Sequence, residues 1–141
     1  MTLKAANEEE MIGIGRQCAR QAVDGSVFIL SGDLGAGKTH WTKGLVAGLG
    51  SPASVTSPTF GLVHEYTGGS LPVFHFDFYR LESAEELITI GWDDYLEREG
   101  VTVIEWGERF AELIPAGATW VRIRTLEDGS REIELTTFDT G

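Results

Sequence analysis

Hydrophobic and polar positions repeat with two different periods along the chain, which predicts a mixture of helices and strands. A first helix is expected to begin after Asn7, where Glu10 completes a capping-box pattern. Its apolar face is expected to consist of Met11, Ile14, Gly15, Cys18, Ala19 and Ala22. Continuous apolar runs at 27–30 and 101–104 predict buried strands, and a second helix is expected from 37 or 38 to about 49.

The later part of the chain carries shorter elements. Strands at 62–66 and 72–79 are expected to pair antiparallel across a turn at 67–70. Helical segments are expected after Ser83, at 92–98 and at 108–114, and the tail is expected to form a hairpin with strands 120–126 and 131–138. Helices alternate with strands early and hairpins dominate later. We therefore predict an α/β fold with a mixed parallel and antiparallel sheet, in one domain spanning residues 1–141.

Charge and composition narrow the classes of partner. The net charge is −11, and the basic residues are scattered rather than clustered, so we expect no binding to DNA and no tight, direct contact with RNA. A single cysteine, Cys18, excludes an intramolecular disulfide and fits a reducing compartment. The N-terminus is polar, and no apolar run approaches the ~20 residues that span a bilayer. These features predict a cytoplasmic protein without a membrane partner.

The strand at 27–30 runs into a phosphate-loop pattern, Gly32-Asp33-Leu34-Gly35-Ala36-Gly37-Lys38-Thr39, which fits G-x-x-x-x-G-K-[ST]. Glycines let the backbone turn its N–H groups toward a phosphate, and the following helix adds positive charge at its N-terminus. Lys38 is expected to reach the β- and γ-phosphates, and the Thr39 hydroxyl to bind Mg²⁺. The pattern therefore predicts a site for a nucleoside triphosphate with Mg²⁺. The residues expected to hold it are Asp33, Leu34, Gly35, Ala36, Gly37, Lys38 and Thr39.

Two carboxylates are candidates for holding the metal ion. Glu105 follows the buried strand 101–104 and should lie at its carboxyl end, where ligands bind in open α/β sheets. Asp77 lies in an alternating strand that should place phenylalanines on one face and His75, Asp77 and Tyr79 on the other. We favour Glu105 as the direct ligand, with Asp77 either supporting the metal site without touching the metal or placing the attacking water. An exposed strand end for Glu105 and a solvated outer face for Asp77 are the alternatives.

Two further segments are candidates for responding to the γ-phosphate. Residues 56–59, Thr-Ser-Pro-Thr, follow the phosphate-loop helix and carry hydroxyls that could contact metal, water or phosphate; an ordinary connection is the alternative. Trp106 directly follows the candidate metal ligand and could transmit the state of the nucleotide; a buried core tryptophan is the alternative.

Together with the phosphate-loop pattern, several other motifs make the sequence similar to one family, the bacterial ATPases of tRNA threonylcarbamoyladenosine (t6A) biosynthesis, called TsaE. The similarity extends from about residue 8 to Pro115. The matching motifs are GDLGAGKT at 32–39, SPTF at 57–60, HFDFYRL at 75–81, EEL at 85–87, IGWDDYL at 90–96 and VIEWGE at 103–108. The tail after Pro115 lies outside the similarity, so a nucleotide contact from the hairpin stays open, as does a base pocket near Asn7–Glu10.

The resemblance implies a three-layer P-loop NTPase-type fold and a division of roles. Leu34 to Thr39 would wrap the phosphates, Thr39 and Glu105 would hold Mg²⁺, and Trp106 would lie by a nucleotide-dependent surface. The expected catalytic residues are Lys38, Asp77, Glu105 and Thr59. The family hydrolyses ATP slowly and works with a TsaB–TsaD pair, which modifies adenosine 37 of tRNAs that read codons beginning with A.

Two other classes of nucleotide-binding protein stay open as alternatives. A small-molecule P-loop kinase usually carries an arginine-rich lid, whereas residues 40–75 contain no arginine. A nucleotide-dependent regulatory switch of the GTPase kind would need an [NT]-K-x-D motif, and the one Thr-Lys pair, Thr42-Lys43, lacks the aspartate.

Overall fold

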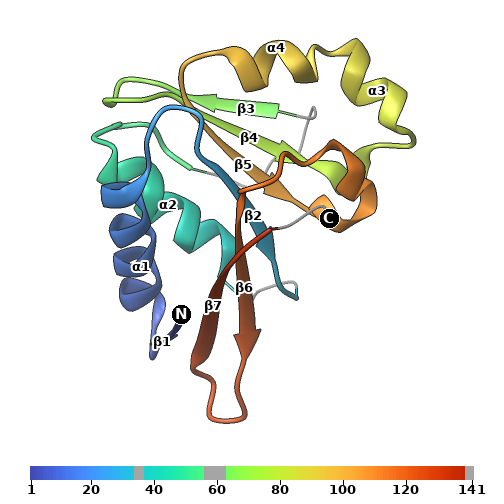
Figure 1. The fold of residues 1–141 in the computed structure, drawn as a ribbon. Helices are drawn as coiled ribbons and strands as arrows, with labels where there is room; N and C mark the ends of the chain where they lie inside the picture. Colours follow the sequence, from blue (N-terminus) through green and yellow to red (C-terminus); the bar gives the residue numbers. More distant parts are fainter. Residues whose placement is uncertain (34–36, 56–62, 139–141) are drawn as a thin grey trace.

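The computed structural model describes residues 1–33, 37–55 and 63–138, and shows a central sheet with helices on both faces (Figure 1). The strands are β1 (Thr2–Ala5), β2 (Val27–Ser31), β3 (Val63–Tyr66), β4 (Val73–Asp77), β5 (Val101–Glu105), β6 (Thr119–Thr125) and β7 (Arg131–Thr137). The α-helices are α1 (Glu8–Gln21), α2 (Lys38–Gly48), α3 (Ala84–Thr89) and α4 (Trp92–Glu97), and the 3₁₀ segments are η1 (Phe78–Arg80) and η2 (Gly107–Leu113). No helix in these described ranges is long and apolar enough to cross a membrane.

The sheet is mixed, as predicted. Its strand order is β1-β7-β6-β2-β5-β4-β3. The four central strands, β6, β2, β5 and β4, run parallel to one another, while the outer pairs β1–β7, β7–β6 and β3–β4 are antiparallel. Parallel strands bring their carboxyl ends to one edge, so Ser31, Asp77 and Glu105 end at the same edge of the sheet.

Two apolar cores lie on opposite faces of the sheet. One joins α1 and α2 to side chains such as Phe28, Leu30 and Val103, and the other joins α3, α4 and η2 to Ile29, Phe76 and Ile104. Successive residues of β2 and β5 enter opposite cores, which explains why both strands are continuous apolar runs. The predicted three-layer α/β fold and the C-terminal hairpin β6–β7 are confirmed.

Helix α1 begins where its capping pattern predicts. The Asn7 side chain accepts a hydrogen bond from the Glu10 backbone N–H at 2.9 Å, and the Glu10 carboxylate accepts one from the Ala6 N–H at 2.8 Å. Ser83 occupies the corresponding cap position of α3, but its side chain makes no capping hydrogen bond there. Three acidic residues also fill the first turn of α1, where they favour the positive end of the helix dipole.

Helices α1 and α2 cross at unusually short range because glycines line the contact. A Cβ on Gly15 would lie 2.1 Å from the Trp41 carbonyl oxygen, and one on Gly44 would lie 1.9 Å from the Ile12 carbonyl oxygen. Both distances are too short for a methyl group, so the two backbones approach each other directly. This contact packs α2 directly against α1.

Two features differ from the sequence-based expectation. Strand β1, which pairs with β7 at one edge of the sheet, was not predicted. The strand expected at 72–79 ends at Asp77, and Phe78–Arg80 form a 3₁₀ turn. Tyr79 therefore does not continue the face of His75 and Asp77. The residue is 61% exposed, and its ring lies 5.1 Å from the Trp106 ring.

Candidate nucleotide site

The residues that flank the phosphate loop have the geometry that the motif predicts. Strand β2 is buried along Val27–Leu30, and α2 begins at Lys38. Gly37 precedes the helix with a φ of +112°, and a Cβ there would lie 3.1 Å from Met11 Cε, so both backbone angle and space favour glycine. Leu34, Gly35 and Ala36, which are predicted to wrap the phosphates, lie outside the described residues, as does Thr59 with the 57–60 segment.

Lys38 and Glu105 are the central pair of the site. Lys38 lies in the first turn of α2 and Glu105 at the end of β5, and their Nζ and Oε1 atoms are 3.6 Å apart. The Glu105 residue is 9% exposed. A cation at the start of α2 and a carboxylate at the end of β5, 67 positions apart in sequence, therefore meet where both side chains are largely buried.

Glu105 has a second and closer partner, His75 of β4. The His75 Nε2 lies 2.7 Å from Glu105 Oε2, and because an ionised carboxylate only accepts, the imidazole donates this hydrogen bond. Burial raises the pKa of the Glu105 carboxyl, but the hydrogen bond and charge of His75 and the ammonium of Lys38 outweigh burial. The pKa therefore lies below its ordinary value, and Glu105 is ionised at neutral pH.

Asp77 lies beside Glu105 on the neighbouring strand. The two residues are register partners in the parallel pair β4–β5. One Asp77 oxygen accepts from the Tyr79 N–H at 3.0 Å and caps η1, and the other lies 3.5 Å from Arg80 Nε. Asp77 thus stands at the sheet edge next to the candidate metal ligand, not on a solvated outer face.

Trp106 is partly exposed and contacts other side chains of the site. Its backbone has a φ of +61°, in the left-handed region that non-glycine residues rarely adopt, and its residue is 38% exposed. Lys38 Nζ lies 5.1 Å from the centre of its ring, within cation–π range, and the Tyr79 ring lies 5.1 Å away. The alternative of a core tryptophan is therefore wrong, and Trp106 joins the site to an exposed aromatic surface.

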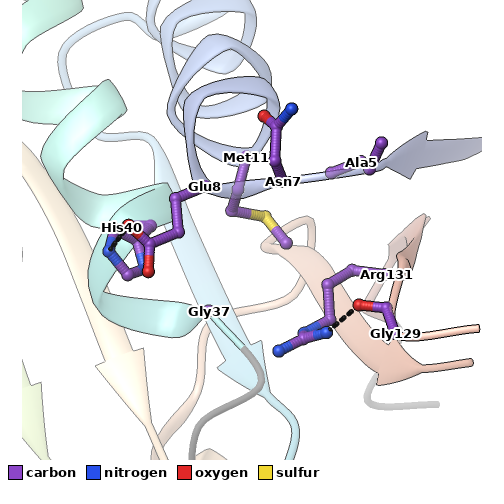
Figure 2. A pocket seen from close by; sticks show the side chains of 9 residues that line it. Ala5, Asn7, Glu8, Met11, Gly37, His40, Gly129 and Arg131 are labelled. Atoms are coloured by element: carbon purple, nitrogen blue, oxygen red, sulfur yellow. Dashed lines mark hydrogen bonds and ion pairs between the residues drawn. The ribbon is translucent and has the colours of Figure 1, made fainter.

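A cavity of about 140 Å³ opens beside Gly37, at the start of α2 (Figure 2). Its lining comes from three segments far apart in sequence: the β1–α1 junction, the start of α2 and the β6–β7 hairpin. The lining residues are Ala5, Ala6, Asn7, Glu8, Met11, Gly37, His40, Gly129 and Arg131. The His40 ring also lies 3.4 Å from the Glu8 carboxylate. The two regions that the sequence left open, Asn7–Glu10 and the hairpin, therefore meet at one cavity next to Gly37.

Two participants were missed by sequence reasoning. His75 was placed on the same strand face as Asp77, but its contact with Glu105 was not foreseen; the shared face was the signal available. Arg131 was not singled out, because no local pattern shows that it lines the same cavity as Gly37.

The donor set fits Mg²⁺ bound with a nucleotide. Mg²⁺ prefers oxygen ligands, takes one or two carboxylates together with substrate phosphates, and keeps several waters. Thr39 and Glu105 supply a hydroxyl and a carboxylate at the start of α2 and the end of β5. Within the described ranges, no three His, Cys, Asp or Glu side chains gather as an all-protein metal cage. A shared protein–nucleotide site for Mg²⁺ needs no such cage.

A parallel strand that runs through a Gly-Lys-Thr loop into a helix, with a carboxylate at the end of the adjacent strand, defines an α/β fold of the P-loop type. The sequence model described as "Threonylcarbamoyl adenosine biosynthesis protein TsaE" matches residues 5–133. The chain therefore belongs to the TsaE family of t6A biosynthesis proteins.

Individual relatives agree with this assignment. The tRNA threonylcarbamoyladenosine biosynthesis protein TsaE of Bacillus subtilis is 41% identical over 133 residues, which cover 94% of this chain and 83% of that protein. TsaE of Treponema pallidum is 45% identical over 121 residues, covering 86% and 89% of the two chains. The crystal structure of Bacillus subtilis YdiB superposes with a TM-score of 0.81 at 36% identity, over 97% of this chain and 84% of that one.

Proposed function

We propose that this protein is the Mg²⁺-dependent ATP-binding and ATP-hydrolysing subunit of a t6A-forming system. It would act in the cytoplasm with TsaD-like and TsaB-like proteins, which transfer the threonylcarbamoyl group to adenosine 37 of tRNAs that read codons beginning with A. The observation that carries the proposal is the meeting of Lys38 with Glu105 at the start of the phosphate-loop helix. The net charge of −11 supports contact with tRNA through partners rather than directly.

Each site residue has a proposed role that follows from its chemistry. The loop residues Asp33 to Thr39 hold the triphosphate, with Lys38 neutralising the β- and γ-phosphates. Thr39 and Glu105 hold Mg²⁺, which stabilises the charge that develops on the transferring phosphoryl group. Asp77 supports the metal site or orients the attacking water, and Thr59 is needed for turnover. Slow hydrolysis is expected without the partner proteins.

The cavity beside Gly37 is the proposed binding place for adenine. At about 140 Å³ it is far smaller than the roughly 300–1,000 Å³ of pockets that enclose whole drug-sized ligands. It therefore suits a planar base rather than a complete nucleotide, and the triphosphate would extend from Gly37 along the loop. The Arg131 side chain lies at its rim, on β7 (Figure 2).

The test uses substitutions matched within one element. Lys38→Ala should abolish ATP binding measured by calorimetry, whereas Lys43→Ala, an exposed lysine on the same helix, should leave it unchanged. Glu105→Ala should lose Mg²⁺-dependent hydrolysis while retaining ATP binding in EDTA, and the exposed Glu108→Ala should behave as wild type. Equal hydrolysis by Glu105→Ala and wild type would refute the metal assignment.

Base recognition and partnership are tested separately. Arg131→Ala should weaken ATP but not inorganic triphosphate, and Arg124→Ala, on the same hairpin outside the cavity, should affect neither. GTP binding as tight as ATP would favour the regulatory switch, and ADP formation matched by a phosphorylated metabolite would favour the kinase. Failure of a TsaB–TsaD-like pair to associate in the presence of ATP would refute the assigned partnership while leaving the nucleotide site intact.

A further inference from the structure

His75 is a buried polar side chain in an otherwise apolar stretch of the central sheet. It stands between Phe74 and Phe76 on β4, and it is 1% exposed. Its Nε2 contacts Glu105, and its Nδ1 has no hydrogen-bond partner among the described residues. A buried ring nitrogen without a partner is unfavourable, because the nitrogen loses its water on folding. Apolar side chains fill the positions on either side of it, so packing alone does not account for an imidazole here.

The two oxygens of Glu105 are divided between two different partners. Oε2 lies 2.7 Å from His75 Nε2, a distance typical of a charge-assisted hydrogen bond. Oε1 lies 3.6 Å from Lys38 Nζ, which is an ion pair beyond hydrogen-bond length. The contact with His75 is therefore the tighter one. The contact with Lys38 is the one that can be exchanged at low cost when Lys38 turns to a phosphate.

The position of His75 along its strand explains how it holds the carboxylate. Glu105 is aligned with Asp77, and His75 lies two residues earlier on β4, on the same face as Asp77. The hydrogen bond to His75 therefore directs the Glu105 carboxylate toward the position of His75, two residues before Asp77 on β4. It also gives this carboxylate a hydrogen-bond donor close to the second carboxylate, that of Asp77. Without that bond, Oε2 would lose its closest hydrogen-bond donor, and the Glu105 side chain would be free to change its rotamer.

We propose that His75 is a positioning residue that anchors Oε2 of Glu105, so that Oε1 stays directed toward the start of α2 for Mg²⁺. This inference rests on the proposed function of Glu105 as a metal ligand. Partners that orient a metal-binding side chain typically affect metal affinity or activity by about 10- to 100-fold when removed. The same range is expected for His75, although it touches neither nucleotide nor metal.

Two substitutions separate anchoring from filling space. The amide nitrogen of glutamine can occupy the place of His75 Nε2 and donate to Glu105, whereas the shorter asparagine places its amide near the former Nδ1. His75→Asn should raise the Mg²⁺ concentration for half-maximal hydrolysis and lower kcat by about 10- to 100-fold, with ATP affinity in EDTA unchanged. His75→Gln should recover most of both. Kinetics within twofold of wild type for both variants, or equal losses in both, would overturn the proposal.

A second measurement needs neither metal nor ATP hydrolysis. In ring ¹H–¹⁵N spectra of wild-type protein alone, the His75 Nε2 proton should exchange slowly with water and resonate downfield, and Glu105→Ala should abolish this signal. A rapidly exchanging proton in wild type, or a signal that Glu105→Ala leaves in place, would refute the anchor even if the variants fail to fold. If wild type shows this proton but neither binds nor hydrolyses ATP, the proposed function fails and the His75–Glu105 anchor stands.

Discussion

Gly44 lies where α2 crosses α1, and replacing it with alanine tests how far the stability of the fold depends on this close approach. A Cβ at Gly44 would lie 1.9 Å from the Ile12 carbonyl oxygen and 3.0 Å from the Arg16 backbone nitrogen. Both neighbours are backbone atoms and cannot rotate away. The helices must therefore separate by more than about 1 Å before a methyl group fits, and the packing around them must follow.

The size of the effect follows from two opposing contributions. Alanine favours a helix over glycine by about 1 kcal/mol, and overpacking a rigid contact costs about 1–3 kcal/mol or more. With backbone atoms on the far side we expect the upper end, a net loss of about 2 kcal/mol in the free energy of unfolding. For a domain of this size that lowers the melting temperature by about 5–8 °C.

The control lies on the partner helix. Gly13 belongs to α1, but a Cβ there meets no atom within 4 Å. Gly13→Ala should therefore raise the free energy of unfolding by about 1 kcal/mol through helix propensity alone. Thermal melts followed by circular dichroism, with urea titrations beside them, compare the two variants. If Gly44→Ala is as stable as wild type, or Gly13→Ala is equally destabilised, the close approach is not what stabilises the crossing.

Three further outcomes are expected. The pKa of Glu105 is lower in the folded protein than the ordinary carboxyl pKa of 4.5. The ionised carboxylate therefore stabilises the fold at pH values above 4.5, and this stabilisation is lost as the pH falls through the folded pKa. Glu105→Gln should therefore cost about 1–3 kcal/mol at pH 7 and show a shallower loss in acid, measured by urea unfolding between pH 7 and pH 3; parallel pH curves would contradict this. Lys38 lies over the Trp106 ring, so ATP should change the tryptophan emission of wild type and not of Trp106→Phe. Burial raises the pKa of the Cys18 thiol, so a thiol reagent at pH 8 should react at the rate of unfolding, and fast reaction in native buffer would place Cys18 outside the core.

The β2–loop–α2 unit and the end of β5 could be predicted because their signals are local. An apolar run followed by Gly-Lys-Thr specifies both the elements and their order, and Glu105 follows its strand directly. Strand β1 could not be predicted in the same way. Its four residues carry no periodic pattern of their own, and they become a strand only by pairing with β7, about 130 residues later.

The environment of β4 could not be predicted from its sequence pattern. Alternation placed His75 and Asp77 on one face, but alternation does not say whether that face meets water or another layer. Here β4 lies between β3 and β5, and the His75 face is covered by the core below α1 and α2, where the Tyr66 ring lies 6.4 Å from the imidazole. The extension of the strand to Tyr79 was wrong because the Asp77 side chain caps a 3₁₀ turn.

The cavity beside Gly37 has a consequence for the motion of the sheet edge. Strand β1 is four residues long and pairs only with β7 in the described sheet, so this edge should open more readily than the central strands. A ligand held between the β1–α1 junction and the hairpin would have to leave before the edge could open. Nucleotide should therefore slow the amide hydrogen exchange of Leu3 and Ile133 while leaving that of β3 unchanged. Binding at the site would then be detectable as slower hydrogen exchange at the β1 edge, the edge farthest from β3, because the ligand suppresses local opening and not because the fold changes.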